Sequence, residues 1–240
     1  MAQSWTQMQP PPLSAGMRIL RRLLFLGAYF GWVKQSMTRT VRTRSLGYDL
    51  TVPPSVFHPR YYFTSKFFGK YISGLPLAGK SVLDIGCGSG ILSLAAARAG
   101  AKVTSVDINP AAVTATNENA RRNGLQGSVY AVESDLFGGL DPSESKFDLI
   151  VCNPPFYDGE PQTMAERAFR GGDGITFMAR LARLSPTFLS PRGSILLVLS
   201  SDANLRSCLV PFDVHGFECR VVKLAKLLFE TLSIIELRRS

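Results

Sequence analysis

The sequence predicts an α/β fold built on a doubly wound, mostly parallel sheet, with a basic N-terminal extension. From residue 81 onward, short apolar runs alternate with helical patterns, the order typical of parallel strands joined by crossover helices. A glycine-rich stretch follows the first apolar run. The 240 residues are 45% hydrophobic and 19% charged, which are globular proportions and exclude a disordered, collagen-like or coiled-coil chain.

The elements are predicted from apolar runs, helix formers and capping residues. In chain order we expect helix Ser65–Ile72, strand Ser81–Ile85, helix Ile91–Ala99, strand Lys102–Val106, helix Pro110–Asn123, strand Val129–Val132, strand Phe147–Cys152, helix Ile175–Leu189 and strand Ser194–Leu199. Asn109 is the expected N-cap of the helix that begins at Pro110, because proline fits the first helical position.

The C-terminal part is predicted to close the sheet. A helical segment near Asp202–Val210 precedes two β runs, Cys219–Leu224 and Thr231–Leu237. No helix lies between these runs, so we expect them to pair as an antiparallel hairpin. The sheet would then have seven strands.

The basic charge lies almost entirely ahead of the glycine-rich stretch. Residues 1–80 hold 11 Lys and Arg and one acid and sum to +10, whereas residues 81–240 hold 16 and 17 and sum to −1. Such asymmetry favours an anionic partner, either nucleic acid or a membrane surface, over a merely solvated extension.

The sequence suggests three segments: a disordered leader over 1–16, a basic and apolar helical extension over 17–46, and a globular domain over 47–240. The uncharged apolar stretch Leu23–Val33 has 11 residues, too few for a transmembrane helix, which needs roughly 20. Three interpretations of residues 17–44 remain open. They form a helix packed on the domain, an amphipathic helix on an anionic membrane, or a contact with RNA or the ribosome.

The four cysteines and two histidines form no metal-binding pattern. Cys87, Cys152, Cys208 and Cys219 contain no CxxC pair. We therefore expect neither a disulfide framework nor a metal site, and a reducing, cytoplasmic compartment, with peripheral attachment to a membrane left open by the extension.

The glycine-rich stretch predicts a cofactor site. Gly86, Cys87, Gly88 and Gly90 follow the strand that contains Asp84, and glycines let the backbone turn sharply and a ligand approach the main chain. A GxGxG stretch alone is also compatible with dinucleotide binding. The Asp84 carboxylate would repel a pyrophosphate and attract an ammonium group, which favours S-adenosylmethionine.

Two further carboxylates follow the next strands. Asp107, which precedes Ile108 in the same site, ends the second strand and can accept both ribose hydroxyl hydrogens. Asp135 follows the third strand and could accept the adenine amino group, with Leu136 against the ring. The alternatives are a helix cap for Asp107 and a plain surface turn for Asp135.

The most specific motif follows the fourth strand. Asn153, Pro154, Pro155 and Phe156 form an NPPF tetrapeptide in which two prolines stiffen the turn. The Asn153 side-chain oxygen and the Pro154 main-chain oxygen can each accept a hydrogen bond from a planar NH2 group, and Phe156 can stack on that group. Such a site would act by positioning and electrostatics.

Together, the glycine loop, Asp107, Asp135 and the NPPF motif resemble those of the class I S-adenosylmethionine-dependent methyltransferases, whose sheet is Rossmann-like. The NPP-aromatic motif resembles the branch that methylates planar nitrogens. That branch includes base amino-methyltransferases and the HemK-type glutamine methyltransferases of release factors. Residues 56–60, 168–174 and 229–233 resemble the HemK-type group.

The resemblance implies an N-methyltransferase whose acceptor is a protein glutamine amide, as in a release factor. The alternatives are an RNA or DNA base amino group, at adenine N6 or guanine N2, and a small molecule. The same motifs bear on two other classes of protein. A non-catalytic binding module is disfavoured by the complete motif set, and an oxidoreductase by Asp84 and by the NPPF motif.

Overall fold

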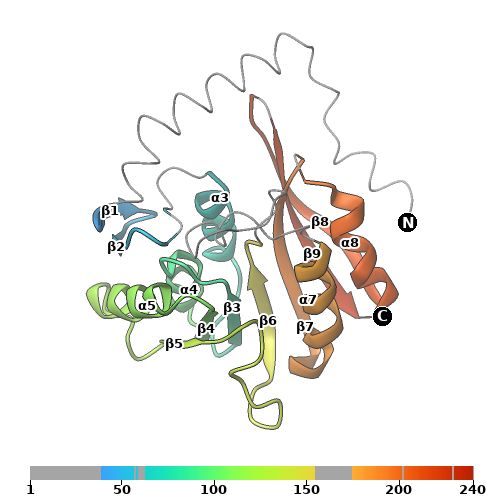
Figure 1. The fold of residues 1–240 in the computed structure, drawn as a ribbon, viewed down its shortest axis with the longest axis horizontal. Coiled ribbons are helices and arrows are strands. Elements are labelled where there is room, and N and C mark those ends of the chain that lie inside the picture. The colour runs from blue at the N-terminus through green and yellow to red at the C-terminus, as the bar shows by residue number, and fades with distance from the viewer. Residues whose placement is uncertain are drawn as a thin grey trace.

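The structure is a computed structural model that describes residues 39–56, 58, 63–154, 175–201, 203–228 and 230–239. One central sheet has helices packed against both faces (Figure 1). Its strands lie in the order β5-β4-β3-β6-β7-β9-β8. Their bounds are β3 Ser81–Ile85, β4 Lys102–Asp107, β5 Val129–Glu133, β6 Phe147–Cys152, β7 Leu189–Ser200, β8 Phe217–Lys226 and β9 Thr231–Arg239.

The strand directions confirm the predicted fold class. Strands β5, β4, β3, β6 and β7 run parallel to one another, whereas β9 pairs antiparallel with both β7 and β8. The two last strands form the closing hairpin that the sequence predicts. The chain proceeds from β3 to β4 and β5 on one side, then crosses to β6 on the other side of β3. This reversal is a topological switch point, where open α/β sheets bind ligands.

Two hydrophobic clusters fill the space between the sheet and its helices. Helices α3 (Phe63–Ile72), α4 (Ile91–Arg98) and α5 (Pro110–Arg122) contribute to one cluster, which includes the fully buried Phe68 and Ile72. Helices α7 (Ile175–Phe188) and α8 (Leu205–Val214) contribute to the other. Apolar burial on both faces explains why the central strands read as continuous hydrophobic runs.

Most predicted boundaries agree with the structure within a few residues. The Asn109 side chain caps α5 as predicted, because its Oδ1 accepts a hydrogen bond from the Ala111 amide at 3.0 Å. One boundary differs clearly: β7 begins at Leu189 rather than at Ser194. Leu189 pairs with Phe147 before a register irregularity, so the strand continues through a stretch whose proline and glycine favour a turn in isolation.

The predicted helical extension over 17–46 is wrong for residues 41–45. Val41–Ser45 is strand β1, which pairs antiparallel with β2, Tyr48–Val52. The two-residue loop between them has positive φ at both positions, 52° at Leu46 and 84° at Gly47, as in the tight turns that match strand twist. Apolar side chains of β2 are buried in the α3–α5 cluster, which explains why a strand forms here. Residues 1–38 lie outside the described residues.

Two asparagines, Asn119 in α5 and Asn123 at its C-cap, hold this hairpin by pairing with the free edge of β2. The Asn119 side chain accepts a hydrogen bond from the Thr51 amide at 2.7 Å and donates to the Thr51 carbonyl at 3.0 Å. Asn123 makes the same pair of bonds with Asp49, at 3.0 and 2.9 Å. Asn119 also donates to the carbonyl of Ser89, at 2.9 Å. The hairpin is therefore joined through one buried side chain to the glycine-rich loop.

Asn119→Ala is expected to lower the free energy of unfolding by about 3 kcal/mol, because it leaves buried backbone groups of two segments without partners. Urea denaturation measures this difference. The control is Arg121→Ala on the exposed side of the same helix, where a change within about 0.5 kcal/mol is expected. Equal stability of the two variants would contradict the anchoring role of Asn119.

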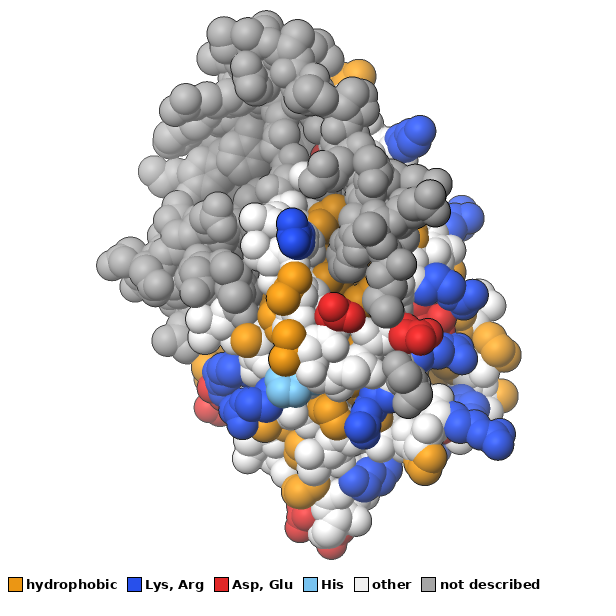
Figure 2. All heavy atoms as spheres, turned by 90° about the vertical axis from the view of Figure 1, so that its right-hand side faces the viewer, with side chains coloured by type: hydrophobic (Ala, Val, Ile, Leu, Met, Phe, Trp, Pro, Cys, Tyr) orange, Lys and Arg blue, Asp and Glu red, His pale blue; other side chains and the backbone are white. Residues whose placement is uncertain are grey.

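The side of the molecule that carries α8 has a mixed surface. Figure 2 shows lysine and arginine side chains there, interspersed with apolar and acidic ones. Val210 and Val214 of α8 are among the exposed apolar residues, 47% and 76% accessible. Among the described residues no helix is both long and apolar enough to cross a membrane.

Candidate active site

Three adjacent strands bring the predicted site residues to one edge of the sheet. Asp107 ends β4, the glycine-rich loop follows β3, and Asn153 follows β6. Ile85 at the end of β3 is level with Val106 on one side and with Cys152 on the other. The carboxyl ends of parallel strands point the same way, so these segments meet at the switch point.

The glycine-rich loop has the backbone conformation that its glycines allow. Gly86, Gly88 and Gly90 all have positive φ, at 72°, 55° and 79°. The amides of Gly86 and Cys87 donate to the Val106 carbonyl at 2.8 and 3.1 Å, which ties the loop to β4. The loop leads directly into the N-terminus of α4.

Gly90→Ala is expected to destabilise the protein by about 2–3 kcal/mol. A Cβ at this position would lie 3.0 Å from Thr116 side-chain atoms and 3.2 Å from its Cα, in addition to the strain of positive φ. Chemical denaturation would measure the loss. Gly124→Ala separates the two effects, since Gly124 has a φ of 70° but no atom within 4 Å, and it should cost only about 1 kcal/mol. A Gly90 variant no less stable than the Gly124 variant would contradict the close approach of Thr116.

Asp84 is a fully buried carboxylate with one unsatisfied oxygen. Its Oδ2 accepts a hydrogen bond from the Ser93 hydroxyl at 2.5 Å, while Oδ1 is buried and has no partner among the described residues. Burial, and the negative charge of Asp107, raise the pKa of Asp84 to about 7, against the opposing effect of the Ser93 hydrogen bond. A buried, unpaired carboxylate oxygen fits the ammonium group of an amino-acid-type cofactor.

Asp107 is held by two backbone amides. Its Oδ2 accepts from the Gly88 amide at 2.9 Å and its Oδ1 from the Asn109 amide at 2.9 Å. Burial raises the pKa of Asp107, and these hydrogen bonds oppose the rise. Each oxygen keeps a lone pair for a further donor, which is compatible with the predicted contact to ribose hydroxyls. Ile108 is half-buried beside it.

Asp135 has a partner that the sequence does not suggest. Arg180 of α7 donates to both of its carboxylate oxygens, at 3.2 and 2.9 Å, and the pair is exposed. The next residue, Leu136, has a φ of 55° and is buried in the cluster beneath α7 and α8. Asp135 is therefore already paired with Arg180, and Leu136 contributes to the interior of the domain.

Asn153 and Pro154 are the described residues of the NPPF motif. Asn153 is half-buried just beyond the end of β6, and Pro154 is buried. Pro155 and Phe156 lie outside the described residues, as do residues 168–174 and residue 229, which carry part of the HemK-type resemblance. The described part of the 229–233 segment begins with Glu230, which immediately precedes β9 and accepts a hydrogen bond from Ser200.

The four cysteines are free, and Cys87 and Cys152 are buried beside the site. Burial and the nearby charges of Asp84 and Asp107 raise the pKa of both thiols, which keeps them protonated at neutral pH. They therefore act as small packing groups. Within the described part of the chain, no group of three or more His, Cys, Asp or Glu side chains could hold a metal ion.

Sequence reasoning missed several residues that shape the site. Four polar residues near the site are fully buried. Thr116 and Asn119 donate to carbonyls of the glycine-rich loop, Ser93 donates to Asp84, and Ser105 donates to Ser93. A usable signal existed for Asn119, because it falls on the apolar face of α5, three and four residues after Thr116 and Ala115. Arg180 carries no such signal, since it pairs with a residue 45 positions away.

The fold and the site define a class I methyltransferase. Its seven-stranded sheet is parallel except for β9, and a glycine loop flanked by carboxylates lies at the switch point. Residues 53–212 match the family model described as methyltransferase small domain. The chain therefore belongs to the methyltransferase small domain family and is an S-adenosylmethionine-dependent methyltransferase.

Curated relatives include enzymes with different acceptors. A putative protein N5-glutamine methyltransferase of Methanocaldococcus jannaschii is 35% identical over 162 residues, which cover 65% of this chain and 80% of that protein. Ribosomal RNA small subunit methyltransferase C of Alcanivorax borkumensis is 37% identical over 121 residues, 50% of this chain and 32% of that protein. The chain thus spans most of the former relative and about a third of the latter.

Among solved structures, the T. thermophilus 16S rRNA N2 G1207 methyltransferase in complex with AdoMet and guanosine has a TM-score of 0.62 and 25% identity. The alignment covers 84% of this chain and 50% of the T. thermophilus chain. The ribosomal protein L11 methylase of Lactobacillus delbrueckii subsp. bulgaricus has a TM-score of 0.56 at 21% identity, covering 79% of this chain and 84% of that one. The second likeness shows the fold.

Proposed function

We propose that this enzyme methylates the side-chain amide of a glutamine in a protein. The observation that carries the proposal is the extent of the match to the glutamine methyltransferase relative, of which this chain spans 80%. The ribosomal RNA methyltransferase relative is matched over only 32% of its length. The glutamine-directed relative is therefore matched over a much larger share of its length than the RNA-directed one.

The cofactor would be held by residues on both sides of the switch point. Asp84 offers its unpaired Oδ1 to the ammonium group, and the backbone of the glycine-rich loop lies alongside the amino-acid end. Asp107 and Ile108 receive the ribose, and Asp135 with Leu136 forms the adenine end. When bound, S-adenosylmethionine supplies an electrophilic methyl group on a positively charged sulfur.

Asn153 and Pro154 would position the acceptor. An amide nitrogen is a poor nucleophile because its lone pair is delocalised into the carbonyl. The Asn153 Oδ1 and the Pro154 carbonyl each accept one N–H, which fixes the nitrogen and enriches it in electrons. With the cofactor bound, the N–CH3 bond would form as the S–CH3 bond of the cofactor breaks, and the bonding electrons would pass to the sulfur. Asn153 is not a base, so the excess proton of the nitrogen passes to water after transfer.

Radiolabelled methyl transfer tests the acceptor class. The enzyme and tritium-labelled S-adenosylmethionine are added to a lysate of the source cells, which is then fractionated into protein, RNA, DNA and small molecules. We expect label in a protein band that yields N5-methylglutamine on proteolytic digestion, and none with the Asn153→Ala variant. Label confined to RNA would replace the glutamine proposal by base methylation.

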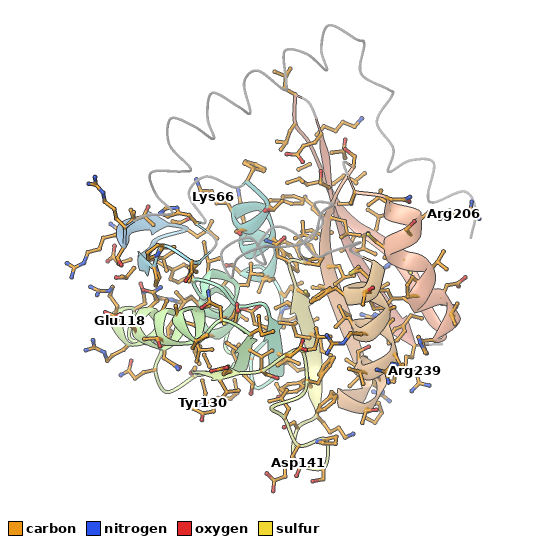
Figure 3. All side chains as sticks on the ribbon, viewed as in Figure 1. Lys66, Glu118, Tyr130, Asp141, Arg206 and Arg239 are labelled. Carbon is orange, nitrogen blue, oxygen red and sulfur yellow. The ribbon has the colours of Figure 1, made fainter. Side chains whose placement is uncertain are left out.

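A basic groove supports RNA as the second candidate acceptor. Arg42, Thr43 and Arg44 of β1 line a groove of about 370 Å³ together with β2 and Arg122 of α5. Asp49 and Glu118 pair with two of these arginines, at 3.7 and 3.1 Å, and leave a net positive charge. Figure 3 labels Glu118 on α5, next to the hairpin. Arginines around a concave surface suit a phosphate backbone.

The groove is tested with Arg42→Glu/Arg44→Glu. We expect the affinity of this double variant for a labelled single-stranded RNA to be about tenfold lower than that of wild type at 50 mM salt. The slope of log affinity against log salt concentration should be smaller by about two. Arg206→Glu/Arg239→Glu, on the opposite side of the molecule (Figure 3), is the control and should reduce affinity much less. Equal losses in the two variants would exclude the groove as the RNA site, and vesicle binding without RNA binding would favour a membrane partner.

A further inference from the structure

Two buried serines form a hydrogen-bonded chain that ends on Asp84. The Ser105 hydroxyl donates to the Ser93 hydroxyl at 2.9 Å, and the Ser93 hydroxyl donates to Oδ2 of Asp84. All three side chains are fully buried. Asp84 and Ser105 are register partners on the parallel strands β3 and β4, so they face the same side of the sheet, which α4 covers with Ser93.

The chain has a fixed direction. A serine hydroxyl has one hydrogen, and the Ser93 oxygen already accepts the hydrogen of Ser105. Ser93 therefore gives its own hydrogen to Oδ2, and this bond favours the ionised form of Asp84. Oδ1 remains the unpaired oxygen within the described residues.

Packing alone does not explain these hydroxyls. The neighbours of Ser93 in α4 are Leu92, Leu94 and Ala95, all buried and apolar, and alanine has a higher helix propensity than serine. An unpaired buried carboxylate oxygen is destabilising, and the folded protein keeps it. A buried acceptor that destabilises the ligand-free protein is expected where a bound ligand supplies the missing hydrogen-bond donor.

We propose that Ser93 and Ser105 are positioning residues that favour the ionised form of the Asp84 carboxylate and leave its Oδ1, which is unpaired among the described residues, to accept from a cationic ligand group. The ligand half of this proposal rests on the assignment of Asp84 to the ammonium group of the cofactor. We call the hydrogen-bonded chain from Ser105 through Ser93 to Asp84 the relay. The relay half of the proposal concerns the cofactor-free protein and can be tested separately.

The titration of Asp84 tests the relay without cofactor. The carboxyl carbon is followed by NMR in protein labelled with 13C-aspartate, and Asp84→Asn assigns the signal. Charged groups near Asp84 include Asp107, whose titration is followed in the same spectra. We expect Ser93→Ala to raise the Asp84 pKa by about one or more, Ser105→Ala to raise it less, and Ser93→Thr to preserve it.

Ser185→Ala is the matched control, because Ser185 is also fully buried in a helix but lies in α7 and bonds only weakly, at 3.4 Å, to Ala182. It should leave the Asp84 titration unchanged. An unchanged titration in Ser93→Ala overturns the relay. If Ser93→Ala does not fold, Ser105→Ala decides, and its wild-type titration overturns the proposal in the same way.

Calorimetric binding of S-adenosylmethionine tests the ligand half. At pH 7 we expect Ser93→Ala to bind about fivefold more weakly than wild type, because a smaller fraction of Asp84 is ionised. The difference should narrow at pH 8.5, where the carboxylate is ionised in both proteins. A shifted titration with unchanged affinity at both pH values would overturn the ligand half alone. It would also remove Asp84 from the cofactor site, whereas the methyl transfer of the proposed function would stand.

Discussion

Replacing Asn153 with alanine is expected to reduce methyl transfer at least ~100-fold while the affinity for S-adenosylmethionine stays within about threefold. The variant loses the side-chain oxygen that would orient the acceptor nitrogen, an interaction needed most in the transition state. Asp84, Asp107 and the glycine-rich loop are unaffected, because Asn153 lies on a different strand end. Single-turnover rates and calorimetric binding measure the two quantities.

Asn117→Ala is the control for Asn153→Ala. Asn117 pairs with the backbone of Ala131 on β5, at 2.9 and 3.0 Å, away from the switch point. This variant is expected to lose stability but to keep its turnover. Turnover close to wild type in Asn153→Ala would exclude the proposed mechanism, whatever the effect on binding.

Replacing Asp84 with asparagine is expected to weaken cofactor binding by a factor of about 100 or more, since the buried charge that matches the ammonium group is lost. The wild-type melting temperature should rise with added S-adenosylmethionine and not with NAD. The melting temperature of the variant should rise much less with S-adenosylmethionine and not with NAD. A cofactor-induced rise as large as that of wild type would show that Asp84 does not contact the ammonium group.

The same substitution is expected to change how stability depends on pH. The folded-state pKa of Asp84, about 7, is raised above the ordinary value of 3.8, so between these values the folded state binds more protons than the unfolded state. The contribution of Asp84 to the free energy of unfolding is therefore fully present below about pH 4, falls as the pH rises and is lost above about pH 7. The asparagine side chain of the variant does not titrate. The free energy of unfolding of the cofactor-free variant, relative to that of wild type, should therefore rise by roughly 2 kcal/mol between about pH 5 and pH 8.

Urea denaturation at about pH 5 and pH 8 measures this gain. Asp148→Asn is the control with the opposite sign, because a hydrogen bond from the Ser81 amide lowers the pKa of Asp148. Its effect on stability should therefore appear on acidification below about pH 5 and not between about pH 5 and pH 8. If the Asp84 variant has the same pH profile as wild type, burial does not raise the pKa of Asp84.

Local sequence signals were sufficient for most of the sheet. Strands β3 and β6 begin and end where their apolar runs predict, and the cap and first proline of α5 are read directly from Asn109 and Pro110. These features depend on residues a few positions apart. Residues 41–45 are basic and mixed in composition, so their sequence alone does not indicate a strand. They form a strand because they pair with β2, and β2 is in place because it packs on α5.

The sequence by itself determined the fold class, the glycine-rich loop and the set of polar residues at strand ends, because each is encoded in neighbouring positions with a fixed period or turn. Only the tertiary structure decided which buried groups meet. Ser93 bonds Asp84 across 9 positions and Ser105 bonds Ser93 across 12, and Asn119 joins β2 to the loop across 68 and 30. Hydrogen bonds of this kind depend on how strands and helices are stacked, which no local pattern specifies.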